Sequence, residues 1–283
     1  MKTFEELENR YIFTGILVLK EAMHIGSGEG DERADSLFVK SKSTDQFYIP
    51  GSSLRGALRS MVERIAYTLG KNTCLLFDGN SSTTCVTAKP ELIEDRKKEI
   101  EQRGGEWNES EILNFLKDGH ICDTCKVFGS THFASKIKIT DLYPIQVDNN
   151  NPQGVIRYGV GIDRDTETTS QGALFEIEVL EREYKFDFEL IAENLSGKEE
   201  WGLLCIGLWE MMRDKENGGA FYIGANSASG LGRCQLTDLK IRYFDQKDEN
   251  YNLVKYLSED KLGCISGEDA QNFVHRKVKK FLE

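Results

Sequence analysis

The first residues that suggest chemistry lie in the segment YIPGSSLRGALRSMVERIAYTLG, residues 48–70. Ser52 and Ser53 follow a Pro-Gly pair, and Arg55 and Arg59 come one helical turn apart in the apolar-periodic stretch that follows. The N-terminus of a helix presents unpaired amide hydrogens and a partial positive charge, which together bind phosphate. The segment therefore predicts a phosphate site, and its plain alternative is a serine-capped helix with solvated arginines.

A second glycine-rich stretch, GANSASGLGR, covers residues 224–233. It lacks the lysine of a nucleotide-binding phosphate loop and leads into a strand rather than a helix, so it is not a nucleotide fingerprint. Ser229, Gly230 and Arg233 suit the close passage of a sugar–phosphate chain. A structural turn accounts for the same residues equally well.

Cysteines form a third group. The chain has seven, an odd number that argues against a disulfide framework. Cys122 and Cys125 form a Cys-x-x-Cys pair that, with Cys74 and Cys85, predicts a tetrahedral zinc site. Such a zinc ion is structural, because four thiolates leave no open position for a substrate. A redox pair, unliganded thiols, or His120 as a substitute ligand are the other interpretations.

The loop GSGEGDERADS, residues 26–36, is acidic and glycine-rich. It carries Asp31, Glu32 and Asp35 just upstream of the predicted phosphate site. A carboxylate beside a bound phosphodiester can hold Mg²⁺, which neutralises charge and positions the attacking oxygen. An ordinary solvated loop is the plain alternative.

Composition limits the function classes. The 283 residues carry a net charge of −11, which excludes a whole-surface nucleic-acid coat but allows a local basic groove. No apolar run approaches the roughly 18 residues of a membrane span. The polar start, MKTFEELENR, does not resemble a signal peptide. We expect a cytoplasmic protein with no membrane partner.

Hydrophobic periodicity predicts the elements that must position these residues. Their order of strand, helix, strand, strand, helix, strand is that of a ferredoxin-like α+β domain. Residues 71–130 and the long polar stretch that begins near 146 interrupt it as insertions. We expect strands near 11–20, 36–40, 46–50, 134–145, 174–181, 184–191 and 234–244, and helices near 54–69, 198–216 and 268–283.

Several motifs, taken in order, resemble the repeat-associated mysterious protein (RAMP) superfamily. They are His24-Ile-Gly, Ala-Asp35-Ser, the segment from Pro50 to Arg59, and the late SASGLGR loop. The stretch GVGIDRDTETTSQGALFEIEVL resembles the protruding hairpin, or thumb, of the backbone subunits in that family. The nearest resemblance is to the repeated backbone subunit of type III CRISPR effector complexes.

The resemblance implies a single ferredoxin-like (RRM-like) RAMP domain over residues 1–283, with a cysteine-bearing insertion at 71–130 and a thumb hairpin at 145–173. Copies of such a subunit stack along a guide RNA (crRNA) with other CRISPR effector subunits. A loop aspartate, here Asp35, cleaves complementary target RNA with Mg²⁺ or another divalent ion. The implied RNA-binding residues are His24, Ser52, Ser53, Arg55, Arg59, Arg157, Arg164, Ser229, Gly230 and Arg233.

Three other functions stay open at the level of sequence. The first is a crRNA-binding filament subunit that does not cleave. The second is a guide-RNA-processing endoribonuclease with a histidine as general base, for which His24 is the candidate. The third is a zinc-bearing structural module with an acidic surface.

Overall fold

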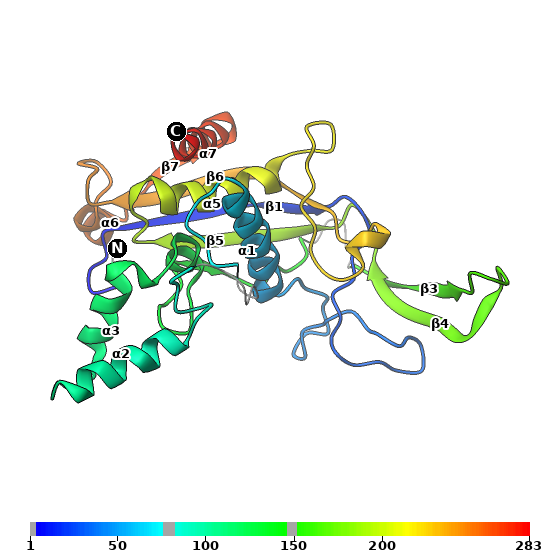
Figure 1. The fold of residues 1–283 in the computed structure, drawn as a ribbon. Coiled ribbons are helices and arrows are strands. Elements are labelled where there is room, and N and C mark those ends of the chain that lie inside the picture. The colour runs from blue at the N-terminus through cyan, green and yellow to red at the C-terminus, as the bar shows by residue number, and fades with distance from the viewer. Residues whose placement is uncertain (1–3, 76–82, 146–151) are drawn as a thin grey trace.

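A five-stranded antiparallel sheet forms the centre of the molecule (Figure 1). The computed structural model describes residues 4–75, 83–145 and 152–283. The strand order is β2-β5-β1-β6-β7. The strands are β1 (Asn9–Leu19), β2 (Ile137–Ile139), β5 (Lys185–Glu193), β6 (Cys234–Asp245) and β7 (Gly263–Ser266). The long strands alternate buried and more exposed residues over much of their length, so one face of the sheet is packed.

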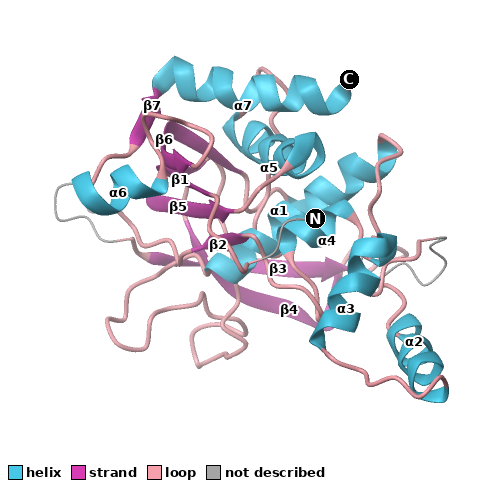
Figure 2. Ribbon diagram, turned by 90° about the vertical axis from the view of Figure 1, so that its left-hand side faces the viewer, coloured by secondary structure: helices cyan, strands magenta, loops and turns pink. Residues whose placement is uncertain are grey.

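Three helices pack on that face (Figure 2). They are α1 (Gly51–Thr68), α5 (Gly197–Met212) and α7 (Gly267–Leu282). Helix α5 contacts both of the others, and ten of its 16 residues are buried. A helix that is apolar nearly all round belongs inside a core, whereas α7 has a single apolar stripe and covers the outside. A short helix, α6 (Leu253–Glu259), follows β6.

The cysteine-bearing insertion has a hydrophobic cluster of its own. It contains α2 (Glu91–Gln102), α3 (Glu109–Phe115), a π-helical turn (Leu116–His120) and α4 (Asp123–Phe128). Nine buried residues form the cluster and four of them are cysteines, which explains why the segment has little apolar periodicity. Residues 76–82 of the expected insertion lie outside the described residues.

Strands β3 (Gly154–Ile162) and β4 (Thr169–Leu180) form a separate two-stranded hairpin that projects from the body (Figure 1). The strand expected near 174–181 is the second half of β4 and pairs with β3, in agreement with the resemblance of residues 159–180 to a protruding hairpin. Alternating residues identify a strand but do not choose its partner. Residues 146–151 of the expected hairpin lie outside the described part of the chain.

The segments 36–40 and 46–50 do not form regular strands. They pair only through isolated bridges, including Gly26 with Phe38 and Lys40 with Phe47. Within the described residues, no helix combines the length and the apolar character that crossing a bilayer requires.

Candidate functional site

Asp35 lies at the base of the projecting hairpin. Its Oδ2 accepts a hydrogen bond from the backbone amide of Glu176 on β4, at 2.8 Å. The next residue, Ser36, forms a parallel bridge with Ile177. The acidic loop is thus fastened to the hairpin strand, and Asp35 is held on the surface where the hairpin leaves the body.

Asp31 closes the turn that leads to Asp35. Its Oδ1 accepts hydrogen bonds from the backbone amides of Arg33 and Ala34, and its Oδ2 accepts one from the Arg33 side chain. The bonds from Arg33, with a smaller contribution from Ala34, lower the pKa of Asp31 below its usual range. Asp31 therefore stabilises the turn in this loop.

His24 is buried rather than facing a ligand, with 4 % of its surface exposed. Its Nδ1 lies 2.6 Å from the carbonyl oxygen of Glu178, and its Nε2 lies 3.1 Å from Oγ of Ser36. Both ring nitrogens are occupied by protein atoms. In this structure the His24 side chain connects the Asp35 loop to β4, and its contact with RNA stays a prediction.

Helix α1 begins earlier than the serines suggest. Its N-cap is Pro50, with no side-chain cap, and Gly51 is its first residue. The amide of Gly51 donates to Oδ1 of Asp141 at 2.8 Å, so a protein carboxylate already occupies the first position where a phosphate was expected. Ser52 is exposed and Ser53 is half-buried. The expected serine cap of α1 is therefore wrong, and phosphate binding at the start of this helix stays a prediction.

A groove of about 720 Å³ runs along the exposed side of α1. One wall is the helix, through Ser53, Ala57, Ser60 and Arg64, and the other is residues 220–227. Arg64 is the charged side chain among the described residues that line this groove. In a chain with a net charge of −11, this groove offers hydroxyls and one guanidinium that could donate hydrogen bonds to an anion.

The glycine-rich loop forms the second wall because it comes close to the His24 segment. Gly224 has φ +91°, and a Cβ there would collide with the carbonyl oxygen of His24. The amide of Ala225 donates to that same oxygen at 2.9 Å. Ser229 ends a short 3₁₀ turn, and Gly230 follows it in a left-handed conformation. The groove and the Asp35 loop therefore share His24 as a common neighbour.

Arg55 and Arg59 point away from this groove. Arg55 is half-buried and donates to the carbonyl oxygen of Phe128. Burial lowers the pKa of Arg55, and the nearby Arg59 lowers it further. Arg59 is 8 % exposed and its donors are directed at protein acceptors. The guanidinium of Arg59 therefore lies inside the protein, and RNA binding by Arg59 stays a prediction.

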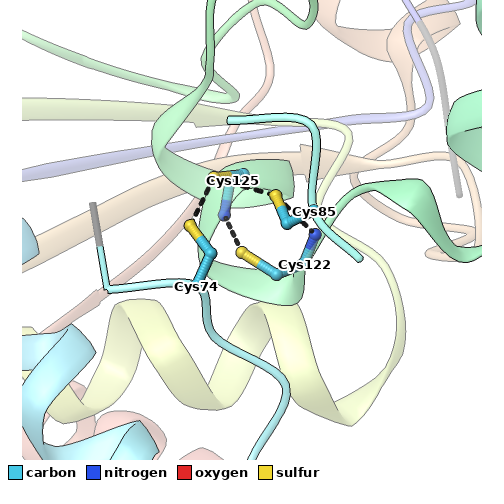
Figure 3. A group of neighbouring side chains, drawn as sticks. All are labelled: Cys74, Cys85, Cys122 and Cys125. Carbon is cyan, nitrogen blue, oxygen red and sulfur yellow. Dashed lines mark hydrogen bonds between the residues drawn. The ribbon is translucent and has the colours of Figure 1, made fainter. Parts of the chain in front are cut away.

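The four predicted cysteines meet at one point (Figure 3). Their sulfur atoms lie within 4.8 Å of one another, and all four residues are buried and outside any disulfide. Backbone amides donate to two of the sulfurs: that of Cys122 to Cys85, and that of Cys125 to Cys122. The Cys122 side chain lowers the pKa of the Cys125 thiol. The cluster is compatible with a structural zinc site.

His120 is not part of that cluster. Its ring stacks on Phe115 with 3.8 Å between centroids, and its Nδ1 lies 3.3 Å from the carbonyl oxygen of Thr84.

The hairpin arginines lie on the surface: Arg157 pairs with Glu181 at 3.2 Å, and Arg164 sits in the turn between β3 and β4. Arg233 is half-buried in a bridge with Tyr222, which places it at the end of the glycine loop.

The model of the RAMP superfamily matches residues 17–235, a span that holds the Asp35 loop, α1, the cysteine cluster, the hairpin and the glycine loop. The chain belongs to the RAMP superfamily. One curated relative is the CRISPR system Cms endoribonuclease Csm3 of Methanocaldococcus jannaschii, which is 25% identical over 247 residues. The match covers 83% of this chain and 82% of that relative. The resemblance drawn from the motifs is thereby confirmed, with this RAMP protein as a distant homologue of Csm3.

Sequence reasoning missed the groove face of this RAMP protein. Ser53, Ala57, Ser60 and Arg64 recur at intervals of three and four, which places them on one side of a helix. That spacing was the available signal. It was hidden by the more conspicuous arginines at 55 and 59, which the structure places on another face.

Proposed function

We propose that this RAMP protein is a crRNA-binding backbone subunit of a type III CRISPR effector complex that cleaves complementary target RNA through Asp35. The relative named above is described as an endoribonuclease of a CRISPR system. The proposal for this chain includes RNA partners, other effector subunits and stacking with further copies of itself.

A ferredoxin-like core is the second part of the proposal. In support, strands β1, β2, β5 and β6 are neighbours in the order β2-β5-β1-β6, and their pairs are antiparallel. Helix α1 lies between β1 and β2 in the chain, and α5 lies between β5 and β6. Two strand–helix–strand units that interleave in this way define the ferredoxin-like arrangement. The insertion and the thumb hairpin then emerge from its loops.

The groove beside α1 is our candidate path for the crRNA backbone. Ser53, Ser60 and Ser227 supply hydroxyls, Arg64 supplies a guanidinium, and Tyr222 offers a ring on which a base can stack. Contacts of this kind read the sugar–phosphate chain and carry no base code. Base pairing between crRNA and target would supply the sequence information.

The projecting hairpin fits the role of a thumb. It exposes Tyr158, Ile162 and Leu174, each with more than half of its surface open to solvent. Exposed apolar side chains gathered on one element mark an interaction surface. In the proposed complex these side chains interrupt the guide–target duplex and distort the target backbone.

The position of Asp35 where the hairpin leaves the body is the observation that carries the cleavage proposal. In the proposed reaction the 2′-hydroxyl of the target attacks the adjacent phosphorus, and the bond from phosphorus to the 5′-oxygen breaks. The products are a 2′,3′-cyclic phosphate and a 5′-hydroxyl. Asp35 would hold Mg²⁺ or another divalent ion, which supplies charge neutralisation. Alignment of the attacking oxygen comes from the thumb.

The four-cysteine cluster would hold zinc as a structural ion. Its donor set is complete with four thiolates, so the ion would fasten the insertion and take no part in RNA cleavage. This assigns the two metals to separate places and separate tasks.

The test compares Asp35→Ala and Asp35→Asn with a matched control, Asp45→Asn, an exposed aspartate in the neighbouring loop. Assembled complex is mixed with labelled target RNA with and without Mg²⁺; omitting Mg²⁺ avoids chelators that would also remove zinc. We expect both Asp35 variants to keep crRNA and to lose cleavage by at least about 100-fold, as when one electrostatic stabiliser is removed. Full Mg²⁺-dependent cleavage by Asp35→Ala would remove Asp35 from the mechanism.

A binding subunit that does not cleave is the second candidate. The observation in its favour is that Oδ2 of Asp35 already has a structural use, since it accepts from the Glu176 amide. The same experiment separates the two functions. Equal persistence of the target RNA with and without Mg²⁺ in the unaltered complex would select the second.

A further inference from the structure

We propose that Arg59 is a positioning residue of the four-cysteine metal site, where its buried guanidinium offsets thiolate charge and fastens the site to helix α1. The inference rests on the zinc proposal above and concerns the surroundings of the ion rather than its ligands. It gives a function to an arginine that the sequence assigned to RNA.

The guanidinium of Arg59 contacts three different acceptors. Its Nη2 donates to Sγ of Cys125 at 3.2 Å, its Nη1 to the carbonyl oxygen of Gly129 at 2.8 Å, and its Nε to Oε1 of Glu63 at 2.8 Å. Arg59 and Glu63 are both buried, so these contacts are shielded from water. The planar fork of an arginine can satisfy three acceptors at fixed angles, which an ammonium cannot do.

The contact between Arg59 and Cys125 matters because a four-thiolate metal site carries negative charge. Four thiolates around a divalent ion leave two negative charges in a buried place, and burying uncompensated charge is costly. Arg59 brings a positive charge into direct contact with one of the sulfurs. An arginine side chain stays protonated in proteins, so the guanidinium is a permanent cation beside the site.

Glu63 has the opposite effect on the charge near the thiolates. Its carboxylate pairs with Arg59 and withdraws part of the positive charge that the thiolates experience. The two residues make separable contributions, because Arg59 contacts the site and Glu63 contacts Arg59, and the two side chains carry opposite charges. Removal of Arg59 should weaken metal binding, and removal of the Glu63 charge should strengthen it.

Helix α1 therefore contacts both the four-cysteine site and the groove. On one side of the helix, Arg59 donates to the carbonyl oxygen of Gly129 in the turn after α4, and Arg55 donates to that of Phe128 at the end of α4. The opposite row, with Ser60 and Arg64, lines the groove. Outer hydrogen bonds to metal ligands of this kind are worth about 10- to 100-fold in metal affinity.

The test uses the full chain and the zinc ion, with dissociation constants measured by competition with a chromophoric chelator at one pH. The variants are Arg59→Met, Arg59→Lys and Glu63→Gln, and the control is Arg103→Met, an exposed arginine in the same insertion. We expect Arg59→Met to raise the zinc dissociation constant about 10- to 100-fold. Arg59→Lys should have a zinc dissociation constant between those of the wild type and Arg59→Met. Glu63→Gln should lower this constant, and Arg103→Met should leave it unchanged.

Cobalt substitution gives a readout that depends on the sulfur ligands themselves. Loss of the hydrogen bond to Cys125 makes that thiolate a stronger donor, so the thiolate-to-Co²⁺ charge-transfer band should move to lower energy in Arg59→Met and stay in place in Arg103→Met. If Arg59→Met does not fold, the opposite shifts of Arg59→Lys and Glu63→Gln decide the matter. A folded Arg59→Met with unchanged zinc affinity, or Glu63→Gln weakening zinc as Arg59→Met does, would overturn the inference. Wild-type protein that binds no zinc would instead overturn the metal site itself.

Discussion

The buried ion pair between Lys136 and Glu200 allows a quantitative prediction about stability. The side chain of Lys136 is 0% exposed and that of Glu200 is 6% exposed, with 2.7 Å between Nζ and Oε2. Lys136 also donates to the carbonyl oxygen of Asn194 at 3.0 Å, and the amide of Ser196 donates to Glu200 at 2.8 Å. The pair joins the start of the β2 segment to the first turn of α5.

Removing one partner leaves the other as a buried charge, which costs about 3–5 kcal/mol. We therefore expect Lys136→Met and Glu200→Leu each to lower the free energy of unfolding by about that amount. At about 2–4 °C per kcal/mol, the melting temperature should fall by about 6–20 °C. The double variant Lys136→Met/Glu200→Leu should lose much less than the sum, because an apolar pair of similar volume needs no compensation.

The assay is urea unfolding of the zinc-loaded chain, followed by circular dichroism and analysed as a double-mutant cycle. Lys138→Met is the matched control, since Lys138 lies two residues away and pairs with Glu193 at the same 2.7 Å but is 63% exposed. It should cost less than about 1 kcal/mol. A single variant at Lys136 that costs no more than the Lys138 control, or a double variant equal to the sum, would refute the reasoning.

Three further predictions concern metal, acid and salt. Removing zinc should speed hydrogen exchange across residues 83–133 while α5 stays protected, because four of the nine residues in the insertion core are cysteines; equal acceleration in both regions would contradict this. Burial raises the pKa of Glu193, but Lys138 and Arg10 outweigh it and leave a net lowering. The ionised carboxylate of Glu193 should stabilise the fold at pH values above its unfolded pKa, and this stabilisation should be lost as the pH falls through the lower folded value. Glu193→Gln should therefore reduce the dependence of the free energy of unfolding on pH in the acid range. Arg64→Ala should reduce the log–log salt slope of RNA binding by about 0.7, the loss of one phosphate contact, and an unchanged slope would move the RNA path elsewhere.

Much of the secondary structure followed from local pattern. The strand near 11–20, the helices near 54–69, 198–216 and 268–283, and the strand near 234–244 correspond to β1, α1, α5, α7 and β6. The four-cysteine set was also predicted from the sequence, because few other residues suit a tetrahedral zinc site. The strand near 174–181 was also predicted, but its period-two alternation contains no information about its neighbour, and only the resemblance to a hairpin indicated that it lies outside the central sheet.

The functional residues divide in a similar way. The sequence found Asp35 as a candidate and the glycine loop as a neighbour of RNA, and both remain proposals that the arrangement of the loops supports. It placed the RNA contacts on the side of α1 that carries Arg55 and Arg59, because arginines are the usual phosphate ligands and their burial is not visible from residue type. It also gave His24 to RNA, although both ring nitrogens contact protein atoms.

The amino-acid sequence alone determined the periods of the helices and strands, the membership of the RAMP family and the four cysteines that form one cluster. These properties depend on residues close in the chain or on side-chain chemistry that does not change with context. The tertiary structure decided which row of α1 meets the groove, which strand pairs with β4, and that Lys136 is an internal cation. The physical reason is that a side chain's role as ligand, partner or core atom depends on what packs against it, and those neighbours come from segments far away in the chain.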